Sequence, residues 1–108
     1  LGLGTGLGSA LIVDGIIVPM ELAHLPYQHG KTYEHYLGER GLKRKGLKAW
    51  RKQVAAVVKH LRAALEPDYV VLGGGNAKKL KSLPRGVRRG DNEDAFLGGV
   101  RLWEGAPQ

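Results

Sequence analysis

Cysteine is absent from the 108-residue sequence, which excludes disulfide bridges and thiolate metal sites within it. Aromatic residues make up only 6% of the chain and do not alternate with basic ones, so no stacking platform for single-stranded nucleic acid is visible. The apolar runs, such as residues 10–13, are far shorter than the roughly 20 residues that cross a membrane. No signal peptide is recognisable. We therefore expect a cytoplasmic globular protein without zinc, membrane contact or a specific nucleic-acid partner.

Acidic residues are missing from one long stretch of the chain. Residues 40–65 hold nine Lys and Arg and no Asp or Glu, and fifteen of the 17 basic residues fall between Arg40 and Arg89. The net charge of +7 is thus concentrated in one part of the sequence. This favours a polyanion partner such as polyphosphate, a nucleotide or nucleic acid, but a solvated basic surface explains the charge equally well. Charge alone leaves both possibilities open.

Local patterns predict a single domain in which strands and helices alternate, that is, an α/β fold. Asp14-Gly15 between two apolar runs is typical of a two-residue hairpin turn. Apolar residues recur at helical spacing from Leu47 to Leu65, and Pro67 ends that helix. Residues 20–46 are polar and rich in glycine, which predicts a mostly irregular functional excursion. We expect a hairpin over 1–18, helices over 32–37, 47–65, 76–83 and 93–103, and strands over 68–72 and 87–89.

The first candidate site is the glycine-rich string Leu3-Gly-Thr-Gly-Leu-Gly8. Glycines let a backbone approach a phosphate closely and turn its N–H groups inward, and the Thr5 hydroxyl adds a donor. The string is not the dinucleotide-binding fingerprint, because a hairpin pattern follows it rather than a helix. A glycine-rich hairpin with a structural role is the alternative interpretation. The residues proposed to bind phosphate are Gly4, Thr5 and Gly6.

The second candidate site is Glu21-Leu-Ala-His24, directly after the hairpin. A carboxylate and an imidazole three residues apart can bind neighbouring hydroxyl groups of a sugar. A single histidine without cysteines does not make a metal site. Taken alone, a surface Glu and a loop His are the simpler interpretation.

The third candidate site is the run that follows the expected strand 68–72. A strand that leads through glycines into a helix N-terminus is a common way to bind phosphate or a nucleotide. Asn76 is expected to cap the following helix. A tight turn that needs small residues is the alternative. The residues proposed to bind nucleotide are Gly73, Gly74, Gly75 and Asn76.

The order of these motifs resembles the C-terminal lobe of ROK-family sugar kinases, and most closely the polyphosphate glucokinase branch. The resemblance rests on residues 3–10, on Val13-Asp-Gly15, and on residues 33–44 and 68–80. It also rests on Ala95-Phe-Leu-Gly-Gly99 and on Arg101-Leu-Trp103. It covers nearly the whole chain. It implies a ribonuclease-H-like lobe of the actin-like ATPase type over residues 1–108.

The resemblance also implies roles for the candidate residues. Gly4 to Gly6 would belong to the second phosphate loop, Glu21 and His24 would bind glucose, and residues 73–76 would face a nucleotide. Ala23 stands where the family's E-x-G-H motif has glycine. Mg²⁺ would accompany the phosphoryl donor, polyphosphate or ATP. The cationic track expected to hold polyphosphate consists of Lys43, Arg44, Lys48 and Arg51.

The same resemblance implies that half of such an active site is missing from these residues. The D-x-G-G-T phosphate loop and the aspartate that acts as general base are not among them, so we expect no catalytic residue here and an inactive isolated chain. The sheet should be incomplete at its N-terminal strand, with an exposed edge that favours a homo-oligomer. A non-catalytic sugar-sensing or dimerisation module of ROK type is the alternative to a glucokinase lobe.

Overall fold

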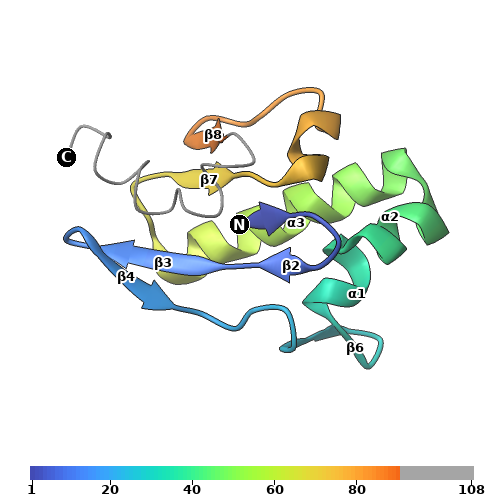
Figure 1. The fold of residues 1–108 in the computed structure, drawn as a ribbon, viewed down its shortest axis with the longest axis horizontal. Coiled ribbons are helices and arrows are strands. Elements are labelled where there is room, and N and C mark those ends of the chain that lie inside the picture. The colour runs from blue at the N-terminus through green and yellow to red at the C-terminus, as the bar shows by residue number, and fades with distance from the viewer. Residues whose placement is uncertain (91–108) are drawn as a thin grey trace.

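The computed structural model describes residues 1–90. The helix expected over 93–103 and the motifs of residues 95–99 and 101–103 lie outside the described residues. A layer of short strands packs on one face against a long helix, with two further short helices beside it (Figure 1). The α/β class predicted from the sequence is confirmed.

The strand layer is built from four two-stranded ladders. Strand β1 (Gly2–Leu3) pairs antiparallel with β2 (Leu7–Gly8), and β7 (Val70–Leu72) pairs parallel with β8 (Val87–Arg89). A parallel bridge between Gly2 and Gly73 joins β1 to the end of β7. Strand β2 continues through Ser9 into β3 (Ala10–Val13), which pairs antiparallel with β4 (Ile16–Pro19). The order across the layer is therefore β4, then β3 with β2, then β1, β7 and β8.

The β3–β4 hairpin has the predicted turn. Asp14 and Gly15 adopt φ values of 50° and 78°, as a turn with two left-handed central residues requires. The second strand extends one residue beyond the predicted end of the hairpin at residue 18, since Pro19 lies within β4 opposite Ala10. Among residues 1–90, the edge of β3 that faces away from β4 has no strand partner. The exposed edge was expected at the N-terminal strand, but β1 pairs with β2 on one side and is bridged to Gly73 on the other.

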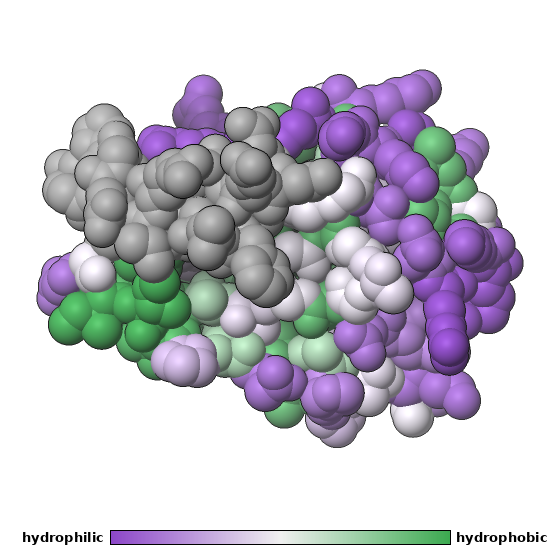
Figure 2. All heavy atoms as spheres, viewed as in Figure 1, coloured by the Kyte–Doolittle hydropathy of each residue, from purple (hydrophilic) through white to green (hydrophobic). Residues whose placement is uncertain are grey.

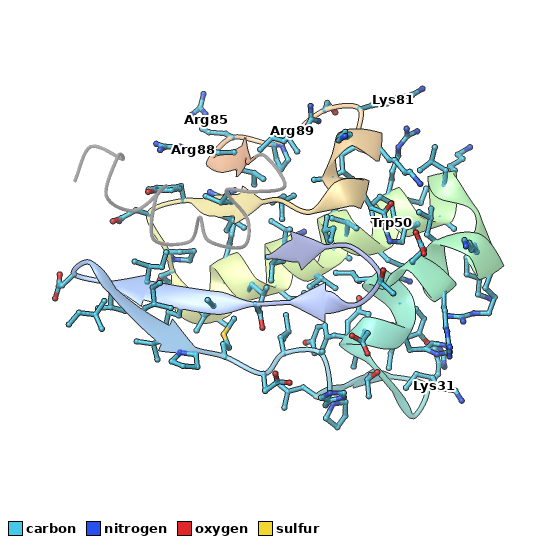
Figure 3. The ribbon with its side chains drawn as sticks, viewed as in Figure 1. Lys31, Trp50, Lys81, Arg85, Arg88 and Arg89 are labelled. Atoms are coloured by element: carbon cyan, nitrogen blue, oxygen red, sulfur yellow. The ribbon has the colours of Figure 1, made fainter. Side chains whose placement is uncertain are left out.

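Helix α3 (Leu47–Leu65) has the predicted bounds and forms the core together with the strands. Its buried face carries Trp50, Val54, Val57 and Val58. Trp50 points into the interior (Figure 3), and its indole N–H donates to the Leu37 carbonyl over 3.0 Å. This bond satisfies the one polar group of a side chain that is only 1% exposed.

The segment from 20 to 46 is more regular than predicted. It contains β5 (Pro26–Gln28), β6 (Lys31–Thr32), α1 (Tyr33–Leu37) and α2 (Glu39–Lys45). The short helix expected over 32–37 is confirmed as α1. Helix α2 was missed because Gly38, Gly41 and Gly46 were interpreted as helix breakers. Gly41 instead allows α2 to pack against α1, since a Cβ there would lie 2.5 Å from the His35 carbonyl oxygen.

The expectation of a helix over 76–83 is wrong in length and in its cap. The structure has a 3₁₀ helix, η1 (Gly75–Lys79), whose N-cap is Gly74 and which has no side-chain cap. Two arginine side chains, rather than a longer helix, hold the loop that follows η1. Arg51 donates to the Lys79 carbonyl over 2.7 Å, and Arg89 donates to the Leu80 carbonyl over 2.7 Å.

Candidate functional site

The two glycine loops, which are about 70 residues apart in sequence, meet at the centre of the strand layer. The Leu3 amide donates to the Gly73 carbonyl over 2.7 Å, and the Asn76 side-chain amide donates to the Gly4 carbonyl over 3.3 Å. Gly74 has φ 87° and ψ 168°, a region that is essentially restricted to glycine. A Cβ there would lie 2.6 Å from the Leu3 carbonyl oxygen. The structure therefore brings the first and third candidate sites into direct contact.

The backbone of the first loop, residues 4–6, is arranged as a set of hydrogen-bond donors. All three carbonyls have partners: Gly4 accepts from Asn76, Thr5 from the Glu39 amide over 3.1 Å, and Gly6 from the Gly4 amide over 3.2 Å. Within residues 1–90 the amides of Thr5 and Gly6 have no protein acceptor. No atom lies within 4 Å of a Cβ placed on Gly4, so the loop faces open space. A loop whose carbonyls already accept hydrogen bonds, and whose N–H groups are free to donate, is suited to bind an anion.

A carboxylate that was not predicted as a site residue binds the backbone at the end of this loop. The Glu34 side chain, in the first turn of α1, accepts the Leu7 amide over 2.9 Å. The only local signal was a capping threonine, Thr32, two residues before an acidic residue in the first helical turn. Sequence spacing could not reveal the contact, because it joins residues 27 positions apart.

The proposed sugar-binding pair lies on the loop between β4 and β5. The Glu21 carboxylate and the His24 imidazole are 3.9 Å apart, and their side chains are 82% and 76% exposed. The backbone that carries them is fixed, since the Leu22 amide donates to the Ser9 hydroxyl. Ala23, which replaces the expected glycine, is buried with the core and tolerated there. The two side chains are thus adjacent and open to solvent on a fixed loop.

The cationic track lies on α2 and on the first turns of α3, at the strongly hydrophilic end of the molecule (Figure 2). Lys43 and Lys48 are exposed, and Lys43 lies 3.9 Å from the Glu39 carboxylate. Arg44 donates to the His35 carbonyl over 2.7 Å, and Arg51 donates to Lys79 as described above. Two of the four cations therefore also hold the fold together.

One histidine beside the track is affected both by burial and by nearby cations. Desolvation, followed by the charges of Arg44, Lys31 and Lys45, holds the pKa of His35 below its ordinary value of 6.5. Of these cations only Arg44 belongs to the track, and like charges nearby add to the effect of desolvation because they disfavour protonation. A polyanion would be attracted to the same cations.

A second basic group, Lys81, Arg85, Arg88 and Arg89, lies at the β8 edge of the strand layer (Figure 3). The Arg88 guanidinium lies 3.8 Å from the centre of the Tyr69 ring. Between this edge and α3 is a pocket of about 250 Å³ with an apolar floor that includes Val58 and Leu72. Arg51, Lys52 and Lys81 are among the residues that line it. This pocket adjoins the strand end from which the second glycine loop departs.

Metal ligation finds no support in the part of the chain that the structure describes. No group of three or more His, Cys, Asp or Glu side chains in residues 1–90 is close enough to hold an ion. Likewise, none of the described helices is both long and apolar enough to cross a bilayer.

These features define a class: an α/β lobe in which a glycine hairpin loop and a glycine turn after a central strand meet at the centre of the strand layer, as in the actin-like ATPase fold. No family model matches the sequence. A solved structure shares the fold, namely inorganic polyphosphate/ATP-glucomannokinase from Arthrobacter sp. strain KM. The TM-score is 0.75 with 26% sequence identity, over 95% of this chain and 45% of that one.

Curated relatives agree with the structural match. The chain is 36% identical over 83 residues to polyphosphate glucokinase from Mycobacterium leprae, which covers 73% of this chain and 25% of the relative. The enzyme of the same name from Mycobacterium tuberculosis strain H37Rv is 36% identical, with 31% of it covered. The chain thus spans between a quarter and a third of these relatives. The resemblance to polyphosphate glucokinases and the actin-like ATPase fold predicted from the sequence are confirmed.

Proposed function

We propose that this chain is the C-terminal lobe of a glucokinase that uses polyphosphate, ATP or both to phosphorylate the 6-hydroxyl of glucose. The carrying observation is the loop of residues 4–6, whose carbonyls are occupied while the Thr5 and Gly6 amides remain available. Such a loop stabilises a phosphoryl group by donating to its oxygens. Glucose would be bound by Glu21 and His24, which the similarity to glucokinases supports.

The phosphoryl donor would approach from the side where the two glycine loops meet. Polyphosphate would extend along the track of Lys43, Arg44, Lys48 and Arg51, because an extended polyanion is held by a row of cations. A nucleotide would use Gly73 to Asn76, with the apolar pocket beside Leu72 as space for its base. Mg²⁺ would arrive with the donor, bound chiefly by phosphate oxygens.

The chain alone is expected to bind these ligands without catalysing the transfer. Its 108 residues contain no D-x-G-G-T sequence. No aspartate is found between Asp14 and Asp68, the range that holds the proposed sugar ligands Glu21 and His24. A general base and the D-x-G-G-T phosphate loop would have to come from another segment, because phosphoryl transfer requires both sides to enclose the reacting groups.

Calorimetry with a defined polyphosphate tests the binding role, and an assay for glucose 6-phosphate tests the expected inactivity. We expect measurable affinity that weakens steeply as salt is raised. Lys59→Ala, an exposed cation on α3 outside the track, serves as the control for Lys48→Ala. Equal binding by both variants would refute the track, and glucose 6-phosphate formation by the purified chain would refute the inactivity.

The alternative is a module that senses sugar or dimerises without chemistry. The exposed apolar side chains of the β3–β4 hairpin favour it, since Ile16 is 66% exposed and Val13 is 47% exposed. Glucose binding and concentration-dependent dimerisation without any polyphosphate or nucleotide affinity would support this module over the kinase lobe.

A further inference from the structure

Glu34 occupies a position between the two proposed ligand-binding loops. Its side chain is half-buried, and the Oε1 atom lies 2.9 Å from the Leu7 amide nitrogen. Leu7 begins β2 and is paired with Leu3 across the glycine loop. A carboxylate that accepts a backbone N–H makes a charge-assisted bond, which is stronger than a neutral one. This bond fixes the point at which the loop re-enters the strand layer.

Two glycines leave room for this carboxylate. A Cβ on Gly6 would lie 2.5 Å from Glu34 Oε1, and a Cβ on Gly38 would lie 3.3 Å from Glu34 Cγ. Both contacts are closer than ordinary packing allows. The glycine at position 6 is therefore needed for the support beneath the loop as well as for the approach of a phosphate above it.

The main chain of the same region reaches the other ligand loop. The Glu34 amide donates to the Ala23 carbonyl over 3.1 Å, in the loop that carries Glu21 and His24. Just beyond the other end of α1, at the first residue of α2, the Glu39 amide donates to the Thr5 carbonyl over 3.1 Å. The α1 region thus touches the glycine loop at both ends and the sugar loop at one. A rigid connection of this kind sets the distance between two ligands.

We infer that Glu34 is a positioning residue that holds the Gly4–Leu7 loop in its phosphate-binding shape, and this rests on the proposed function of that loop. By taking the Leu7 amide, Glu34 leaves the Thr5 and Gly6 amides as the donors that face solvent. The negative charge of Glu34 opposes the binding of a polyanion nearby. Glu34 therefore favours binding only through the loop conformation that it holds. A neutral acceptor of the same shape should therefore serve at least as well.

The matched variants are Glu34→Ala, which removes the acceptor, and Glu34→Gln, which keeps an acceptor oxygen and removes the charge. We expect Glu34→Ala to weaken polyphosphate binding roughly tenfold. Glu34→Gln should bind as well as the unaltered chain or more tightly. Glu39→Ala, which removes a carboxylate that does not contact the loop through its side chain, is the charge control and should not weaken binding.

The Leu7 amide gives a spectroscopic readout that needs no ligand. Its proton resonance should lie downfield in the unaltered chain and in Glu34→Gln, and move upfield in Glu34→Ala. In the unaltered chain it should also exchange with solvent deuterium more slowly than the Thr5 and Gly6 amides, which have no protein acceptor among residues 1–90. That measurement requires no substitution, so it remains decisive even if Glu34→Ala does not fold.

A double-mutant cycle with Gly6→Ala separates positioning from general destabilisation. Gly6→Ala should weaken binding in the unaltered chain, where the new methyl displaces the carboxylate, and have a much smaller effect in the Glu34→Ala background. Additive effects, an unchanged Leu7 resonance in Glu34→Ala, or equal losses in Glu34→Gln and Glu34→Ala would each overturn the inference. Failure of the unaltered chain to bind polyphosphate would instead refute the proposed function, while the Leu7 resonance would still decide whether Glu34 holds the loop.

Discussion

The first glycine loop and the β3–β4 hairpin are close together in the sequence but are held very differently. Around residues 4–6, bonds converge from β7, η1, α1 and α2, and a methyl group at Gly74 has no room. The hairpin beyond has its own ladder, and every residue of β4 is exposed. Its apolar side chains form the hydrophobic patch visible in Figure 2. Several contacts within this chain hold the glycine loops in place, whereas the exposed apolar surface of the hairpin is suited to contact with another molecule.

The largest effect should come from closing the space at the loop junction. Gly74→Ala places a methyl group 2.6 Å from the Leu3 carbonyl oxygen, in a backbone region that alanine disfavours. We expect the free energy of unfolding to fall by about 3 kcal/mol or more. Urea titration followed by Trp50 fluorescence measures it. Gly75→Ala is the control, since nothing lies within 4 Å of its Cβ, and equal losses in both variants would contradict this account.

The next largest effect separates the two roles of the cationic track. Arg51→Ala should lower polyphosphate affinity and stability together, by about 1–3 kcal/mol in unfolding free energy, because the Lys79 carbonyl loses its charged donor. Lys48→Ala should lower affinity alone, since Lys48 is exposed. Calorimetry and urea titration on the same samples distinguish the two. A stability loss in Lys48→Ala equal to that in Arg51→Ala would show that the distinction is wrong.

A smaller effect on stability, but a visible one on association, is expected at the hairpin. Ile16→Lys should change the unfolding free energy by no more than about 0.5 kcal/mol, because the side chain is already 66% exposed. It should reduce self-association in sedimentation velocity at high concentration. Ala64→Lys, which adds the same charge at an exposed position of α3, controls for the change of surface charge. An unchanged sedimentation profile in Ile16→Lys would remove the hairpin as a contact surface.

The smallest effect concerns the pH response of His35. Its pKa is lowered in the folded chain, so the folded state binds fewer protons than the unfolded one as pH falls below 6.5. The associated stability is present above that pH and decreases slightly as pH falls toward the lowered pKa. Polyphosphate on the track should neutralise the nearby cations and raise the pKa of His35. NMR titration of its ring with and without polyphosphate checks this, and a downward shift would contradict it.

Much of the local structure could be predicted because it depends on near neighbours. The turn at Asp14-Gly15 follows from two residues that tolerate positive φ, and α3 follows from apolar spacing that ends at Pro67. Helix α2 could not be predicted, because Gly41 acts through a contact with α1 rather than through its own flexibility. The cap expected of Asn76 was wrong for a similar reason, since its amide binds Gly4, 72 residues away.

The candidate site also combines features that follow from local sequence with features that depend on contacts between distant residues. The sequence by itself identified both glycine loops, the Glu21–His24 pair and the concentration of positive charge, because residue type and order carry that information. Only the tertiary structure showed that the two loops touch, that Arg44 and Arg51 also donate to backbone carbonyls, and that Glu34 accepts the Leu7 amide beside the first glycine loop. Those contacts join segments between 9 and 72 residues apart. Chain folding sets such distances, and the strand order that places β1 between β2 and β7 has no signature in any single stretch of residues.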